Sequence, residues 1–201
     1  MFLRPWTGQD YIKGINGERL MIFGESHYDD EAFGDTGHQS DFTPKVVEDI
    51  ITNKKNVRFF KYIGQLFHEE DWTEIWKKVA FANLIQYVFE KGDHPQAEHI
   101  ETITSFYEYL DELKPDKAIV CSSRAWLNWF PKHIDDKAGI ELDDKYRLGI
   151  SYVFKYPRSG GHTLVIGINH TSSREKEYVA NWKPIVTDFL KYKSPTEEHG
   201  G

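Results

Sequence analysis

The stretch LMIFGESHY, residues 20–28, places four consecutive apolar residues before a glycine and a polar run. A short apolar run with polar or glycine boundaries is typical of a β-strand covered on both faces. Three further runs have the same form, VAFA at residues 79–82, AIVC at 118–121 and TLVI at 163–166, and ISYVF at 150–154 is a weaker, edge-type candidate. We therefore expect four central strands.

Helical patterns separate these runs. Apolar residues recur at helical spacing over residues 43–51, where Thr43 and Pro44 form an expected N-cap and first turn, over 59–67, and up to Lys114 after His94–Pro95. Ser122 or Ser123 is expected to cap a short helix, and the last helix is expected over about residues 173–190. The tryptophans at helical spacing are expected in the core. Strands alternating with helices predict an α/β fold, a three-layer α/β/α sandwich with a central, mostly parallel sheet of about four strands.

Length and composition limit the possible classes of protein. The 201 residues suit one domain, expected over residues 1–192 with a frayed tail at 193–201. A single cysteine excludes a disulfide framework and an iron–sulfur cluster, so we expect no cofactor and no metal. No apolar run is long enough to cross a bilayer, and the first residues do not resemble a signal peptide. These features predict a cytoplasmic protein without membrane contact, expected to be a monomer.

Polar residues follow all four expected central strands. Residues 24–30 follow the first, Asn83 the second, residues 122–124 the third and residues 167–174 the fourth. Turns and N-caps favour such residues, but packing does not require them at every strand end. Ligands of parallel α/β sheets bind beyond the carboxyl ends of the strands, and the long connection over residues 28–42 is typical of a binding loop. The sequence predicts a site at this edge.

The polar segments after the expected strands, in their order along the chain, resemble those of the uracil-DNA glycosylase superfamily over about residues 20–190. Residues 24–28, Gly-Glu-Ser-His-Tyr, are similar to the glycine-led motif after the family's first strand. Residues 81–84, Phe-Ala-Asn-Leu, resemble its asparagine segment, and residues 169–173, Asn-His-Thr-Ser-Ser, its histidine motif. The His94–Pro95 segment and the stretch from Leu113 to Val120 resemble its linking helix and third strand.

The resemblance implies a DNA base glycosylase. Such an enzyme hydrolyses the N-glycosidic bond of a flipped base, here a uracil-like, damaged or modified one, in single- or double-stranded DNA. Asn83 would read the base edge with its amide, and His170 would donate a hydrogen bond to the leaving base. Other residues expected around the base are Gly24, Ser26, His27 and Tyr28, with Phe33 or Phe42 stacked on it. Ser172, Ser173 and Arg174 would hold a phosphate at the start of the last helix, and Gly160, Gly161 and His162 are a second phosphate candidate.

Three positions depart from the family pattern. Ser26 stands where the family has its water-activating aspartate, His27 stands where it has a proline, and Thr171 replaces the proline after the histidine. Asp29 is the first substitute for positioning water and Glu25 the second. With these departures, the resemblance does not fix which base the enzyme would release.

Three other interpretations fit parts of the sequence. Gly24-x-Ser26 after a strand, with an aspartate and then His170, follows the order of a serine hydrolase, although Tyr28 replaces the second glycine of the elbow. His27 and His170 at neighbouring strand ends are a candidate pair of metal ligands. A non-catalytic nucleic-acid-binding module on the same fold is the third.

The net charge of −7 opposes non-specific binding to DNA, because duplex affinity depends on neutralised phosphates. A local positive face from helix N-termini, Arg174, Arg158, Lys54 and Lys55 is the expected compensation, with Arg58 close by. We expect weak, salt-sensitive affinity for undamaged duplex.

Overall fold

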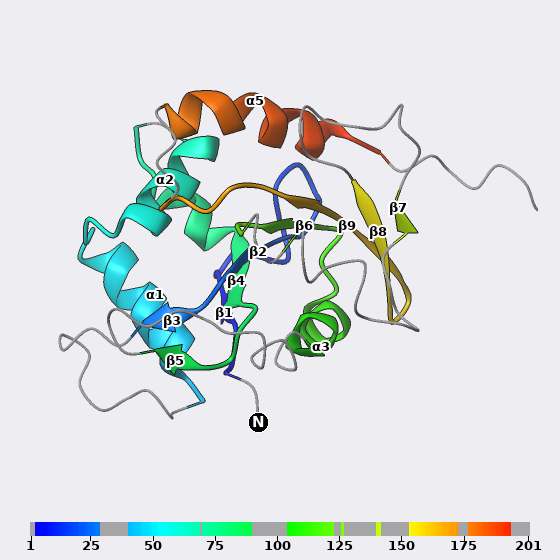
Figure 1. The fold of residues 1–201 in the computed structure, drawn as a ribbon, viewed down its shortest axis with the longest axis horizontal. Helices are drawn as coiled ribbons and strands as arrows, with labels where there is room; N and C mark the ends of the chain where they lie inside the picture. The colour runs from blue at the N-terminus through cyan, green and yellow to red at the C-terminus, as the bar shows by residue number, and fades with distance from the viewer. Residues whose placement is uncertain are drawn as a thin grey trace, which may run out of the picture.

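A computed structural model describes residues 3–28, 40–68, 70–89, 104–122, 126, 140–141, 153–172 and 177–193. Its centre is a seven-stranded sheet with strand order β1-β4-β2-β6-β9-β8-β7 (Figure 1). The strands are β1 (Trp6–Thr7), β2 (Leu20–Gly24), β4 (Val79–Asn83), β6 (Lys117–Val120), β7 (Ile140–Glu141), β8 (Phe154–Arg158) and β9 (Gly161–Gly167). A second, two-stranded sheet pairs β3 (His27–Tyr28) with β5 (Val88–Phe89).

The four expected strands are β4, β2, β6 and β9, and they are adjacent and parallel. The expectation of about four, mostly parallel strands was wrong in number and in strand direction. Strands β1, β8 and β7 add antiparallel pairs at the edges of the sheet. The sheet is therefore mixed. These edge strands are short or carry polar residues and a proline, so they do not produce the apolar runs that identify buried strands.

The edge strand expected at residues 150–154 was misplaced. Residues 150–152 lie outside the described part, and β8 begins at Phe154 and continues to Arg158. Pro157 in β8 pairs with His162 of β9, beyond the two residues that β7 reaches. Among the described strands, none pairs with the other side of β8 at Pro157, so the missing N–H of the proline breaks no ladder between them.

The helices are α1 (Phe42–Thr52), α2 (Arg58–Phe67), the 3-10 helix η1 (Glu74–Lys77), α3 (Thr104–Leu113) and α5 (Tyr178–Lys191). Two expected starts were wrong. Helix α1 begins two residues earlier than expected, at Phe42 rather than Pro44, with Asp41 rather than Thr43 at the N-cap; the Thr43 hydroxyl bonds to His27 instead. Helix α5 begins at Tyr178 instead of residue 173.

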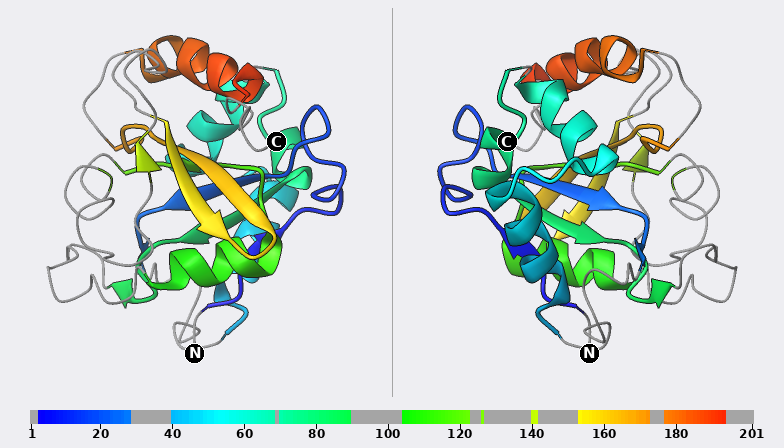
Figure 2. Two further views of the ribbon diagram at one scale, coloured as in Figure 1. Left: turned by 90° about the vertical axis from the view of Figure 1, so that its right-hand side faces the viewer. Right: turned by 90° about the vertical axis from the view of Figure 1, so that its left-hand side faces the viewer.

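Helices pack on both faces of the sheet, with α2 and α5 on one face and α3 on the other (Figure 2). Side chains of a strand alternate between the faces. Ile22 of β2 and Phe81 of β4 therefore join the core under α1, α2 and α5, whereas Met21 and Phe23 join the core over α3. The expected core positions of Trp76, Trp126 and Trp182 are confirmed; Trp129 lies outside the described part.

Gly64 allows α2 to approach the chain before η1. A Cβ added at Gly64 would lie 2.1 Å from the carbonyl oxygen of Trp72, which is backbone and cannot move alone. We expect Gly64→Ala to lower the free energy of unfolding by about 1–3 kcal/mol, the usual cost of overpacking, although alanine is the better helix former. Urea denaturation of both proteins measures the difference, and an equally stable or more stable variant would contradict this packing.

In the part of the chain that the structure describes, no helix has both the length and the apolar character needed to span a membrane.

Candidate functional site

The carboxyl ends of the four parallel strands meet at one edge of the sheet. Gly24 at the end of β2 is in register with Asn83 at the end of β4, and Val120 of β6 with Gly167 of β9. The turns that follow carry Glu25, Ser122 and His170. The expectation that these polar strand ends share one edge is therefore confirmed.

Asn83 lies directly over Gly24. A Cβ added at Gly24 would lie 2.1 Å from Asn83 Oδ1 and 3.3 Å from the Phe81 ring, so only glycine leaves room for the amide. Asn83 is 5% exposed, and the turn below it is held by hydrogen bonds from Leu84 N to Gly24 O and from Ile85 N to Glu25 O. The asparagine amide is thus nearly buried on a rigid support.

The hydrogen bonds of His170 define its neutral tautomer. The Ser172 backbone N–H donates to His170 Nδ1 at 3.2 Å, and the Ser172 hydroxyl lies 2.7 Å from the same nitrogen. Because a backbone N–H can only donate, Nδ1 is an acceptor, and the proton of the neutral ring is on Nε2. His170 therefore presents Nε2 as a donor.

Phe59 is a site residue that the sequence analysis did not identify. Its ring stacks on His170, with centroids 5.6 Å apart and planes at 28°, and it contacts Phe81 at 5.6 Å. Phe81 is two residues before Asn83 on β4, so both face the same side of the sheet. A chain of ring contacts thus brings His170 from the end of β9 to the side that carries Asn83. The sequence indicated only that Phe59 lies on the inner face of a helix.

Ser26 carries a buried hydroxyl just beyond Gly24. Its Oγ has no hydrogen-bond partner among residues that the structure describes. Such hydroxyls are uncommon in folded proteins, since leaving one unpaired costs about 1–3 kcal/mol. Because no histidine there hydrogen-bonds Ser26 Oγ, the arrangement lacks the base that activates a serine nucleophile.

His27 points away from this edge, into the contact between β3 and α1. Its Nε2 lies 2.8 Å from Thr43 Oγ1, and its ring meets Phe42 edge-on at 5.0 Å. Burial lowers the pKa of His27 to about 3, so the ring is neutral at physiological pH. Phe42 is 2% exposed inside the core, so the expectation that it stacks on a bound base was wrong.

Glu25 makes a different contact from the one expected. The buried Ser122 hydroxyl donates a hydrogen bond to Glu25 Oε2, joining the turns after β2 and β6. Glu25 and Ser122 come two residues after Phe23 and Val120, which belong to the core over α3. The carboxylate thus ties two strand ends together on that side.

Several expected site residues cannot be placed. Asp29, Phe33, Ser173 and Arg174 lie outside the described residues, and of Tyr28 only the backbone, in β3, is described. Ser172 is exposed, and its N–H and hydroxyl bond to His170. Because α5 begins at Tyr178, Ser172 is not at its N-terminus, contrary to expectation.

Of the expected basic face, one part borders the site. Lys54 and Lys55 precede α2, where they pair with Asp71 and Asp49, and Arg58 lies over the Tyr62 ring at 5.1 Å. Arg58 is next to Phe59, so the start of α2 is beside His170.

The other part of that expected face lies at the opposite edge. Arg158 pairs with Gly161 at the start of β9 and binds Pro115 O at 3.1 Å. A charged pocket there includes Arg158, Gly160, Gly161 and His162. Since His170 follows the far end of β9, these residues do not share a site with it.

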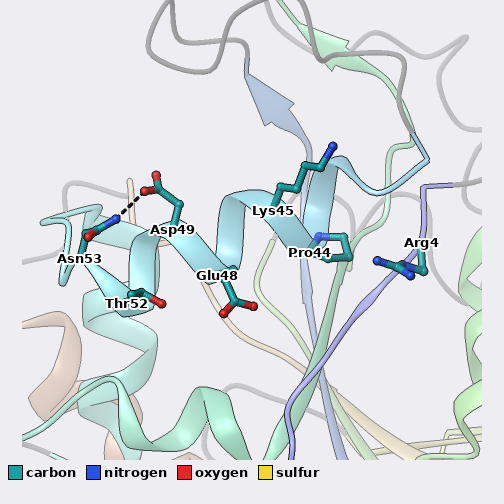
Figure 3. A pocket seen from close by; sticks show the side chains of 7 residues that line it. All are labelled: Arg4, Pro44, Lys45, Glu48, Asp49, Thr52 and Asn53. Carbon is teal, nitrogen blue, oxygen red and sulfur yellow. Dashed lines mark hydrogen bonds between the residues drawn. The ribbon is translucent and has the colours of Figure 1, made fainter.

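A larger pocket of about 460 Å³ lies between Arg4 and helix α1 (Figure 3). Its lining mixes Arg4 and Lys45 with Glu48 and Asp49, and it includes none of the site residues expected from the sequence.

Within the described residues, no group of three or more histidine, cysteine, aspartate or glutamate side chains is placed to hold a metal ion. The Nε2 atom of His27 lies against Thr43.

No protein-family model matches the chain, and no curated protein matches it.

Proposed function

We propose that this protein is a DNA base glycosylase, which flips a base out of DNA and hydrolyses its N-glycosidic bond. The observation that carries the proposal is the run of ring contacts from His170 through Phe59 to Phe81, which lies two residues before Asn83 on the same side of β4 at the carboxyl edge of the sheet. It joins a nearly buried amide and a histidine with its donor on Nε2. We also propose that the helices on the two faces of the sheet form the three-layer sandwich of the uracil-DNA glycosylase superfamily.

These groups suit the reaction. A flipped base is recognised by its hydrogen-bonding edge, and the Asn83 amide offers a donor and an acceptor on a rigid support. Negative charge develops on the base as the bond breaks, and a donor placed in advance stabilises it. His170 Nε2 would be that donor. The buried Ser26 hydroxyl would gain a partner when a base or its attacking water is bound.

Binding of DNA stays part of this proposal. Arg58 is next to Phe59, and Lys54 and Lys55 precede the same helix. Exposed ion pairs such as Lys54–Asp71 contribute little, so their cations can exchange partners with phosphates. The carboxylate that positions water remains a choice between Asp29 and Glu25.

The second candidate is a non-catalytic nucleic-acid-binding module. The hydrogen bond between Ser122 and Glu25 favours it, because it holds that carboxylate on the α3 side of the sheet. This candidate keeps Asn83 and His170 as ligand-binding groups without hydrolysis. A serine hydrolase is a further alternative, but it would need a hydrogen bond from Ser26 Oγ to a base, and the described residues provide none.

The experiment that separates these candidates is a substrate panel. Oligonucleotides carrying uracil, hypoxanthine, xanthine or modified cytosines, single- and double-stranded, are incubated with the protein and treated with alkali. A glycosylase leaves strand breaks at the modified position of at least one substrate, whereas a binding module shifts the oligonucleotide and leaves it intact. An esterase instead cleaves a chromogenic acyl ester and loses that activity in Ser26→Ala.

Asn83→Ala tests the base-reading amide. We expect the variant to release its substrate base roughly 10- to 200-fold more slowly, the effect of losing about 1–3 kcal/mol of recognition. Asn53→Ala is the matched control, because Asn53 is exposed at the end of α1 and its amide bonds only on the surface, to Asp49. Single-turnover rates of base release measure both, and equal rates for Asn83→Ala and Asn53→Ala would refute the assignment.

A further inference from the structure

Tyr87 presents an aromatic ring at the edge of the sheet that carries the proposed site. Tyr87 is 52% exposed. Within the described ranges, the only other exposed large hydrophobic residues are Ile12 and Val57. Tyr87 comes four residues after Asn83 and directly before β5. Single exposed apolar residues are common on protein surfaces, so exposure alone would carry no argument.

The support under Tyr87 is rigid. The preceding residue, Gln86, donates from Nε2 to Asn83 O at 2.5 Å, and its Oε1 accepts from Leu3 N and from the Tyr109 hydroxyl, both at 2.8 Å. The following residue, Val88, is in register with His27. The backbone that carries the ring is therefore fixed on both sides and tied to Asn83.

The ring itself is also held. It meets Phe89 edge-on with centroids 4.9 Å apart, and Phe89 is 3% exposed in the core over α3. An aromatic side chain with a buried neighbour and a fixed backbone loses little conformational freedom when it binds a ligand. Tyr87 is thus a flat apolar surface that is both accessible and ordered in advance.

We infer that Tyr87 stacks on an unpaired nucleobase of the strand whose flipped base is bound at Asn83 and His170. The Tyr87 ring would do so on the α3 side of the same carboxyl edge, which makes this edge a contact surface for single-stranded nucleic acid. The inference rests on the proposed function. Every nucleobase has a π-face, so an exposed ring next to a base-binding site holds the strand without regard to its sequence. Stacking also supplies affinity that needs no positive charge, as suits a chain of net charge −7.

The test is the affinity of the full chain for a labelled single-stranded oligo(dT), which carries no base to be released, measured by fluorescence anisotropy. We expect Tyr87→Ala to raise Kd roughly 10-fold, the loss of one base stack, while Tyr87→Phe and Tyr87→Trp stay within about 2-fold of the wild type. The dependence of Kd on salt should keep the same slope in Tyr87→Ala, because no phosphate contact is lost.

Ile12→Ala is the control for removing an exposed apolar side chain. Ile12 is 78% exposed in the connection that leads into the amino end of β2, away from the site. We expect its Kd to equal that of the wild type. A wild-type Kd in Tyr87→Ala, or a loss in Tyr87→Phe as large as in Tyr87→Ala, would overturn the inference.

Measuring base release by the wild type distinguishes a failure of the Tyr87 stacking role from a failure of the proposed glycosylase activity. If the wild type releases a base but Tyr87→Ala binds oligo(dT) normally, only the stacking role is wrong. If oligo(dT) binding depends on Tyr87 but no base is released, the surface stands and the glycosylase activity is wrong.

Discussion

His170→Ala is expected to slow base release by roughly 100- to 1000-fold at saturating substrate, the usual cost of removing one preorganised donor to a developing anion. The hydrogen bond from Ser172 N–H to Nδ1 assigns the proton to Nε2, and the Phe59 ring fixes the plane of the imidazole. Alanine removes this donor without replacing it. The loss should appear in the single-turnover rate and much less in Kd for the oligonucleotide, since the charge develops only in the transition state.

His68→Ala is the matched control, because His68 is exposed just after α2. It should release base at the wild-type rate. A His170→Ala protein that retains its melting temperature and the wild-type rate would show that His170 takes no part in bond cleavage.

The unfolding free energy of the protein is expected to fall as the pH drops from about 6.5 towards 3, with His27 as a main cause. Burial lowers the pKa of His27 to about 3, whereas in the unfolded chain it returns to its ordinary value near 6.5. Between these values the unfolded state binds a proton that the folded state does not, so acid favours unfolding. At about 1.4 kcal/mol per pKa unit, this one side chain costs up to roughly 5 kcal/mol at the acid end.

His27→Gln tests that origin. Glutamine keeps a polar partner for Thr43 and does not titrate, so the variant should lose less stability than the wild type between pH 7 and 4. Urea denaturation across that pH range measures the slopes, and carboxylates contribute equally to both proteins. Parallel curves for wild type and His27→Gln would contradict the buried neutral histidine.

The central strands and their carboxyl ends could be predicted because fully covered strands require uninterrupted apolar runs. Residues 20–23, 79–82, 118–121 and 163–166 all lie in strands or directly at their ends. The antiparallel edges could not be predicted, because β1 and β7 are two residues long and β8 contains Pro157. Such edges are set by tertiary pairing rather than by a local pattern.

The site was predictable by residue type but not by contact. Asn83 and His170 stand out as polar residues after strands, whereas Phe59 has the same spacing as any core residue of a helix. Phe42 shows the converse, since an aromatic residue after a long connection suits a binding loop but here begins α1 and packs against His27. Ring contacts between distant segments leave no periodic signal in a single sequence.

We propose that the edge carrying Asn83 and His170 catalyses cleavage of an N-glycosidic bond in DNA. Mass spectrometry of oligonucleotides carrying uracil, hypoxanthine, xanthine or modified cytosines, incubated with wild-type protein or His170→Ala, tests it most directly. We predict that the wild type converts at least one substrate into the free base and the matching abasic strand, and that His170→Ala does so at least about 100-fold more slowly. Intact oligonucleotides with the wild-type protein, or equal release by both proteins, would contradict the claim.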